Sequence, residues 1–157
     1  MKKTIAVIGS SNQSDTTIVS RLAALGYPLL LADRKWERVK QCILNQHAEA
    51  SVEMLDCSHE CAWQADVILL YHSEEYLQLL GKIKNVVTGK IIVNMVSDFK
   101  SKEVQDLLPF SKVVHILADF TSEVVSYTVR GENNHAVEQV LLLFDEIGFK
   151  SNQRNHS

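Results

Sequence analysis

The sequence predicts an α/β fold, with a mostly parallel sheet of about seven to eight strands and helices on both of its faces. Short, nearly all-apolar runs alternate along the chain with segments whose apolar side chains recur at helical spacing. Strands that are covered on both faces have such continuous apolar runs, and parallel strands need a crossover helix between them. Glycines follow several helical segments, where they can end a helix in the left-handed conformation. We therefore expect three layers in a single domain over residues 1–150, followed by a polar tail over residues 151–157.

The first half of the chain alternates strand and helix from its start. The first helix has Ile18, Leu22 and Leu25 on one apolar stripe. The second helix has Trp36 and Ile43 on one stripe. The elements expected are, in order, a strand Thr4–Ile8, a helix that ends at Gly26, a strand Pro28–Ala32, a helix Lys35–His47, a strand Ser51–Leu55, a short helix Ser58–Gln64 and a strand Asp66–Tyr71.

The second half continues the alternation and ends in a long amphipathic helix. Asn133 or Asn134 can cap this helix, and Gly148 can end it. Its apolar face includes Val140 and Phe144. The elements expected before it are a helix Glu75–Val87, a turn at Gly89-Lys90, a strand Ile91–Val96, a short helix Lys100–Leu107, and strands Lys112–Leu117 and Val124–Arg130.

Composition and charge argue against several classes of partner. The net charge is −3 and no basic block is present, so we expect no nucleic acid partner. The apolar run after Met1-Lys-Lys is too short for a signal peptide, and no segment approaches the length of a membrane span. We therefore expect no membrane association. The odd number of cysteines, three, favours free thiols in the reducing cytoplasm.

The run Cys57-Ser-His59-Glu-Cys61 has some features of a zinc site. On a helix the two thiols share one face, but His59 points elsewhere and no fourth ligand is evident. We therefore expect no metal site and interpret both cysteines as structural. His115 interrupts an apolar strand, and we interpret it as a hydrogen-bonded buried or edge histidine rather than a catalyst.

Several short stretches carry a family resemblance through their order and spacing. They are Ile5-Ala-Val-Ile-Gly9, Leu22-Ala-Ala-Leu-Gly26, Asp33-Arg34, Gly89-Lys-Ile-Ile-Val93, Lys112-Val-Val and Glu146-Ile-Gly148-Phe149. In this arrangement the chain resembles the NADP-binding Rossmann domain of deazaflavin-dependent NADP oxidoreductases. It is also similar to the cytosolic domain of six-transmembrane metalloreductases and, more distantly, to pyrroline-5-carboxylate reductases. The resemblance implies a three-layer Rossmann-like fold and an NAD(P)-binding, oxidoreductase-like function, with NADP or NAD as cofactor and no assigned substrate.

The chain departs from this family around the expected cofactor cleft. The family has glycines where this chain has Ser10, Asn12 and Asp15, and an asparagine where it has Ala118. The family's long segment with substrate-site residues between the sixth and seventh strands is reduced to Ala118–Glu123. Substrate contacts would then come from a second subunit, through the apolar last helix, so we expect a homodimer. The alternative interpretation is a non-catalytic Rossmann module with a degraded cofactor site, acting as a scaffold or as a sensor of a metabolite or nucleotide.

The loop after the first strand is the main candidate for dinucleotide binding. Pyrophosphates bind where a strand leads into a helix N-terminus, through backbone N–H groups and the helix dipole. Hydroxyl and amide side chains can replace part of what glycines provide, whereas the carboxylate of Asp15 opposes a bound pyrophosphate. The residues expected to bind are Gly9, Ser10, Ser11, Asn12 and Gln13.

Further candidates lie where the other parallel strands end. Asp33 can hydrogen-bond the 2′-hydroxyl of NAD and Arg34 can hold the 2′-phosphate of NADP, so the choice between the cofactors stays open. A mutual surface ion pair is the alternative for these two residues. Tyr71 and His72 stand where the family has small apolar residues along the nicotinamide, and we expect them to fill that pocket. The alternative for His72 is proton transfer to a bound substrate, since it is the best-placed titratable side chain. The resemblance adds Ser97, after the fifth strand, to the cofactor contacts and identifies no catalytic residue.

Overall fold

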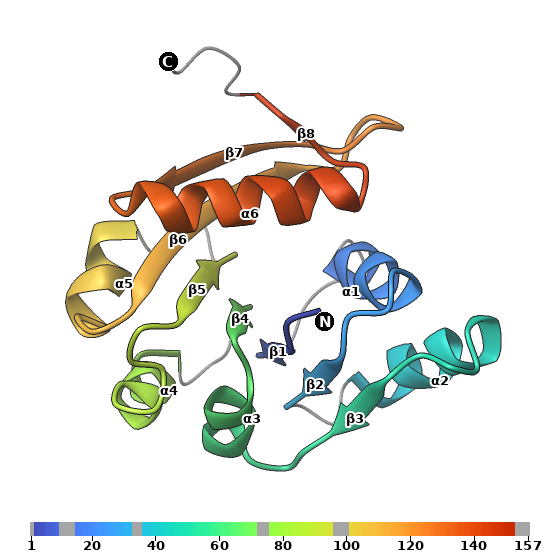
Figure 1. The fold of residues 1–157 in the computed structure, drawn as a ribbon, viewed down its shortest axis with the longest axis horizontal. Coiled ribbons are helices and arrows are strands. Elements are labelled where there is room, and N and C mark those ends of the chain that lie inside the picture. The colour runs from blue at the N-terminus through green and yellow to red at the C-terminus, as the bar shows by residue number, and fades with distance from the viewer. Residues whose placement is uncertain (1, 10–14, 33–35, 72–75, 96–100, 153–157) are drawn as a thin grey trace.

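The computed structural model describes residues 2–9, 15–32, 36–71, 76–95 and 101–152 of the chain. These residues form one eight-stranded sheet between two layers of helices (Figure 1). The strands are β1 (Ile5–Ile8), β2 (Leu29–Leu31), β3 (Val52–Met54), β4 (Val67–Leu70), β5 (Ile91–Asn94), β6 (Lys112–Asp119), β7 (Ser126–Gly131) and β8 (Lys150–Ser151). The helices are α1 (Asp15–Ala24), α2 (Glu37–Gln46), α3 (Ser58–Gln64), α4 (Tyr76–Ile83), α5 (Ser101–Leu107) and α6 (Asn134–Glu146). The three-layer α/β fold predicted from the sequence is confirmed.

The order of the strands gives the sheet a point of reversal. The order is β3-β2-β1-β4-β5-β6-β7-β8, and all neighbours are parallel except β6 and β7. From β1 the chain runs outward through β2 to β3, then crosses back to β4 on the other side of β1 and continues to β5 and β6. The order therefore reverses between β1 and β4, as in Rossmann folds.

Two apolar cores explain why the central strands have no polar face. Every residue of β1, β2, β4 and β5 is buried. One core joins one face of the sheet to α1, α2 and α6, and the other core joins the opposite face to α3, α4 and α5 (Figure 1). Successive strand residues alternate between the cores, so that Val7 lies in the first and Ile8 in the second. The continuous apolar runs of the sequence follow from this two-sided burial.

Strand β6 is longer than predicted and is covered unevenly. Its antiparallel ladder with β7 continues as far as Asp119, beyond the expected end at Leu117. Val114 and Ile116 are buried in the core beneath α6, whereas Leu117, which points to the other face, is 55% exposed. The carboxyl half of β6 is thus packed on one face only.

Several helix ends follow the capping pattern expected from the sequence. Gly26 and Gly148 have φ angles of 92° and 85°, the left-handed conformation that ends α1 and α6. Asn133 caps α6, because its Oδ1 accepts a hydrogen bond from the backbone N–H of Ala136 at 2.9 Å. Helix α4 departs from the expectation, because it ends at Ile83 rather than at Val87, before the β-branched residues 86–88 that disfavour helix.

The prediction that Leu25 belongs to the buried stripe of the first helix is wrong. Helix α1 ends at Ala24, and Leu25 lies in the turn that leads to Gly26, with 37% of its surface exposed. Val19 and Ala23 are buried in its place. The helical periodicity no longer applies once the chain has left the helix.

The end of the chain adds a strand that the sequence did not predict. Lys150 and Ser151 form β8, which pairs in parallel with β7 and includes the first residue of the expected tail. Phe149, just before it, is buried, and its ring centre lies 5.7 Å from that of Phe144 and 5.9 Å from that of Phe120. This aromatic contact places a polar strand that has no apolar pattern of its own.

Two glycine substitutions test whether the positive φ of Gly26 requires a glycine, separately from the packing around it. An added Cβ at Gly26 comes no closer than 3.9 Å to the Lys2 side chain, and an added Cβ at Gly81, inside α4, has no atom within 4 Å. We expect Gly26→Ala to lower the free energy of unfolding by about 1–2 kcal/mol because of its positive φ. Gly81→Ala should raise it by about 0.5–1 kcal/mol because the helix interior favours alanine. Urea denaturation checks both values, and equal effects of the two variants would contradict the left-handed assignment.

Candidate functional site

The candidate site lies at the carboxyl edge of the parallel strands, beside β1. In open α/β sheets, ligands bind outside the carboxyl ends of the strands, where the strand order reverses. Gly9 follows β1 and Tyr71 follows β4, which are the two strands at the reversal. The edge of the sheet that carries these two residues is therefore the expected binding edge.

Most residues that the sequence assigns to the cofactor lie outside the described residues. These are Ser10, Ser11, Asn12, Gln13, Asp33, Arg34, His72 and Ser97. Each belongs to a segment that directly follows β1, β2, β4 or β5 in the sequence. Their roles stay predictions, and the described part of the site consists of the residues that border these segments.

Gly9 has the backbone conformation that its position requires. Its φ angle is 97°, which favours glycine, and the residue is buried. Its carbonyl oxygen accepts a hydrogen bond of 2.8 Å from Nε1 of Trp36. Trp36 directly precedes α2 and is 2% exposed. The indole therefore fixes the end of β1 to the start of α2, a role that the apolar pattern of the sequence could not show.

Tyr71 lies in the core rather than on the surface of the edge. Its side chain is 2% exposed, and its ring centre lies 5.7 Å from that of Trp36 at an interplanar angle of 53°. Both rings belong to the core that includes α1. The two aromatic side chains thus pack together beside Gly9, on the α1 side of the sheet.

A row of polar side chains crosses the next strands at the same edge. Asn94, the last residue of β5, pairs with His115 of β6, which pairs with Arg130 of β7. Asn94 is fully buried, and its Nδ2 lies 2.9 Å from Nδ1 of His115. Because an amide nitrogen only donates, Nδ1 accepts, and neutral His115 carries its proton on Nε2. His115 is thus a hydrogen-bonded strand histidine, as interpreted from the sequence.

The environment of His115 favours the neutral imidazole. Burial lowers the pKa of His115, and the positive charge of Arg130 lowers it further. A neutral imidazole with an Nε2 proton beside a guanidinium can donate to an anionic or carbonyl oxygen. The sequence shows Asn94 and His115 as interruptions of apolar strands, but only the strand register brings them together with Arg130.

The cysteines and the acidic residues offer little to a metal at the described positions. Among the residues that the structure describes, no group of three or more His, Cys, Asp or Glu side chains is placed to hold a metal ion. Cys61 is buried in the α3 core, and burial raises the pKa of its thiol to about 12, whereas Cys57 is exposed. Over the same residues, no helix is long and apolar enough to cross a membrane.

Comparisons with solved structures identify the fold, while no family model and no curated protein matches the sequence. Pyrroline-5-carboxylate reductase from Coxiella burnetii is similar with a TM-score of 0.76 and 14% identity, over 99% of this chain and 60% of the reductase. Pyrroline carboxylate reductase from Plasmodium falciparum, with NADP bound, has a TM-score of 0.73 and 11% identity, over 96% of this chain and 58% of the reductase. The N-terminal domain of HmdIII from Methanocaldococcus jannaschii has a TM-score of 0.73 and 15% identity, over 96% of this chain and 97% of that domain.

These similarities define what the chain shares with its structural neighbours. The chain spans about three fifths of the length of the two reductases and nearly all of the HmdIII domain. At identities of 11–15% the similarity establishes the fold, which is the Rossmann fold found in NAD(P)-binding reductases. The fold implied by the sequence resemblance is confirmed.

The bond between Trp36 and Gly9 can be tested with a matched pair of tryptophan variants. We expect Trp36→Phe to lower the free energy of unfolding by about 1–3 kcal/mol, because it leaves the buried Gly9 carbonyl without its donor. Trp63→Phe should change it by less than about 0.5 kcal/mol, because Trp63 is 62% exposed. Urea denaturation measures both. Similar losses in the two variants would contradict the role assigned to the indole N–H.

The titration of His115 provides a second test of this edge. We expect an NMR titration midpoint below the ordinary pKa of 6.5, with the proton of the neutral ring on Nε2. Arg130→Gln should move the midpoint upward, because it removes a charge that repels the imidazolium. Since the unfolded state binds the proton more readily, His115 should lower the free energy of unfolding as the pH falls below 6.5. A midpoint above 6.5, or a proton on Nδ1, would overturn this assignment.

Proposed function

We propose that the chain binds NADP or NAD at the carboxyl edge of its sheet and serves as the dinucleotide-binding part of a reductase. The observation that carries the proposal is Gly9, with its φ of 97°, at the end of the central strand β1 where the strand order reverses. A glycine there lets a pyrophosphate approach the backbone. The NADP bound in the Plasmodium falciparum reductase of the same fold supports this choice of ligand.

The proposed contacts combine the described edge with the segments that follow its strands. In this proposal Ser10, Ser11, Asn12 and Gln13 donate to the pyrophosphate near the N-terminus of α1, which begins at Asp15. The carboxylate of Asp15 opposes the phosphates, so we expect weaker binding than a glycine loop provides.

The two halves of the dinucleotide would meet different side chains. Asp33 or Arg34 would contact the adenosine ribose and decide between NAD and NADP. Tyr71, His72 and Ser97 would border the nicotinamide half, although the Tyr71 side chain itself is only 2% exposed. No residue is assigned to catalysis.

The reductase activity of the whole assembly requires groups beyond this domain. The chain spans about three fifths of the reductases that it matches, so we propose that substrate contacts come from a second subunit of a homodimer. The last helix α6, with its 62% exposed Leu142, is the proposed contact. The free cysteines Cys42, Cys57 and Cys61 agree with a reducing, cytoplasmic setting, which we also propose.

A second candidate function is a non-catalytic module that senses a nucleotide or metabolite or acts as a scaffold. The observation that favours it is the packing of Trp36 and Tyr71, both 2% exposed, beside Gly9. Large rings at this edge leave less room for a nicotinamide than the small residues of the related family. The two functions share the binding edge and differ in turnover.

Cofactor binding is tested by thermal stability. We expect NADPH or NADH at roughly ten times its Kd to raise the melting temperature by about 3–6 °C. Asn12→Trp should remove the shift by filling the loop, whereas Trp63→Phe, far from the edge, should keep it. Arg34→Ala should weaken NADPH more than NADH, and Asp33→Ala should do the reverse.

Two results separate the candidate functions. If neither cofactor changes the melting temperature at millimolar concentration, the dinucleotide proposal fails. Steady oxidation of NADPH with a small carbonyl, imine or flavin acceptor, lost in Asn12→Trp, would exclude the non-catalytic module. Binding without any turnover would instead favour it.

A further inference from the structure

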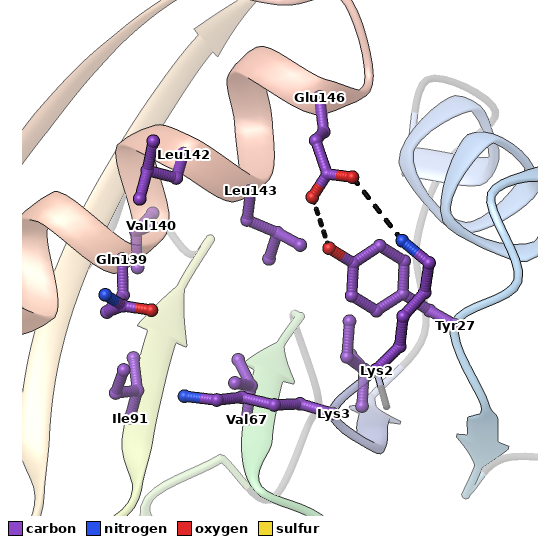
Figure 2. A pocket seen from close by; sticks show the side chains of 11 residues that line it. Lys2, Lys3, Tyr27, Val67, Ile91, Gln139, Val140, Leu142, Leu143 and Glu146 are labelled. Carbon is purple, nitrogen blue, oxygen red and sulfur yellow. Dashed lines mark hydrogen bonds and ion pairs between the residues drawn. The ribbon is translucent and has the colours of Figure 1, made fainter.

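A separate pocket lies at the amino edge of the sheet, at the opposite ends of the strands from Gly9. It is a cavity of about 280 Å³ between the starts of the central strands and α6 (Figure 2). Ile5, Val67 and Ile91, the first residues of β1, β4 and β5, form its floor, and Leu143 of α6 covers it. This volume is close to the lower end of the range for small-molecule sites, which is about 300 Å³.

One end of the pocket is closed by a complete polar cluster. The Tyr27 hydroxyl donates to Oε1 of Glu146, and Nζ of Lys2 lies 3.5 Å from Oε2 of Glu146. The same ammonium lies 4.4 Å from the centre of the Tyr27 ring. The hydrogen bond from Tyr27, with the nearby Lys2, holds the pKa of Glu146 below its usual range, so the carboxylate stays charged. Lys2 and Glu146 therefore neutralise each other.

The other end of the pocket carries Lys3, an exposed lysine, and the described lining at that end includes no carboxylate. Figure 2 shows the Lys3 side chain extending past Val67 toward Ile91 and the side chain of Gln139. Within the described part of the chain, Lys3 forms no ion pair, whereas Lys2 does. With Lys2 and Glu146 neutralised, the pocket retains the single charge of Lys3 beside an apolar floor.

We propose that this pocket binds a small amphipathic carboxylate, such as a medium-chain fatty acid or an aryl-alkanoic acid. Its carboxylate would contact Nζ of Lys3 and the amide of Gln139, and its hydrocarbon body would cover the strand ends. An ammonium and an amide N–H both donate to a carboxylate. The apolar lining, which includes the 62% exposed Leu142 of α6, favours a hydrocarbon over water.

The charge of Lys3 and the apolar lining together argue against a neutral hydrocarbon and against a compact polyanion as the ligand. A neutral hydrocarbon would cover the ammonium of Lys3 without pairing it, which is unfavourable. A phosphate or other compact polyanion would meet one cation and would make no use of the apolar lining at Leu142. A ligand with one negative charge on an apolar body would pair with the Lys3 ammonium and also cover the apolar lining. The site is independent of the dinucleotide proposal, because its residues lie at the other edge of the sheet, although it shares Leu142 with the proposed homodimer contact.

The test uses the full chain with octanoate and phenylacetate as probes and octan-1-ol and acetate as controls. We expect octanoate to shift backbone amide resonances of Ile5, Ile91 and Gln139 in NMR titrations. Octan-1-ol and acetate should each bind roughly tenfold more weakly, because each lacks one of the two matched properties. NADPH should not compete with octanoate.

Variants separate recognition of charge from folding. Lys3→Met, which keeps an apolar stem, should weaken octanoate binding roughly tenfold, and Gln139→Glu should weaken it further by repulsion. Lys82→Met is the matched control, since Lys82 is exposed on α4 at the other face of the sheet. Melting temperatures of the free variants confirm that each one folds.

Three results would overturn the proposal. The first is the absence of octanoate-dependent shifts at the pocket residues. The second is equal binding of octan-1-ol and octanoate, or an unchanged affinity in Lys3→Met, which would show an apolar cavity without recognition of charge. The third is competition between NADPH and octanoate, which would place the probe at the other edge of the sheet. Loss of octanoate binding in Lys3→Met, with retained binding in Lys82→Met, supports it.

Discussion

The structure depends on the burial of β1 between two parallel neighbours and two layers of helices. Its residues Ile5–Ile8 are at most 1% exposed, so water cannot satisfy their backbone groups. The ladders to β2 and β4 do so instead, and helices must return the chain for each parallel pairing. The reversal of strand order and the glycine at the end of β1 follow from this constraint. The carboxyl edge that carries Gly9 is therefore held in place by the core.

The sequence predicts most of the fold because burial on two faces leaves a simple pattern. The runs Ile5–Ile8 and Val67–Leu70 contain no polar residue, and only a covered strand tolerates that. The prediction from sequence fails at one helix end and at a strand whose position depends on contacts between residues distant in the sequence. Leu25 continues a helical period after the helix has ended, and β8 is held by Phe149 against the distant rings of Phe120 and Phe144.

Of the candidate site, only the backbone turn at Gly9 could be predicted from the sequence. Gly9 is recognisable because a glycine after an apolar strand marks a turn, and its positive φ agrees with that prediction. The hydrogen bond from Trp36 could not be predicted, since an indole on an apolar stripe gives no sign of where its N–H points. The row of Asn94, His115 and Arg130 depends on strand register, which local sequence does not contain.

The polar pair within the sheet is not explained by stability alone. Replacing both partners of a buried hydrogen bond by apolar groups is often nearly neutral, so Asn94 and His115 contribute little that an apolar pair would not. The pair lies at the carboxyl edge of the sheet, the edge at which ligands bind in open α/β folds. At the carboxyl edge the sheet thus carries polar side chains where an apolar pair would serve the fold equally well.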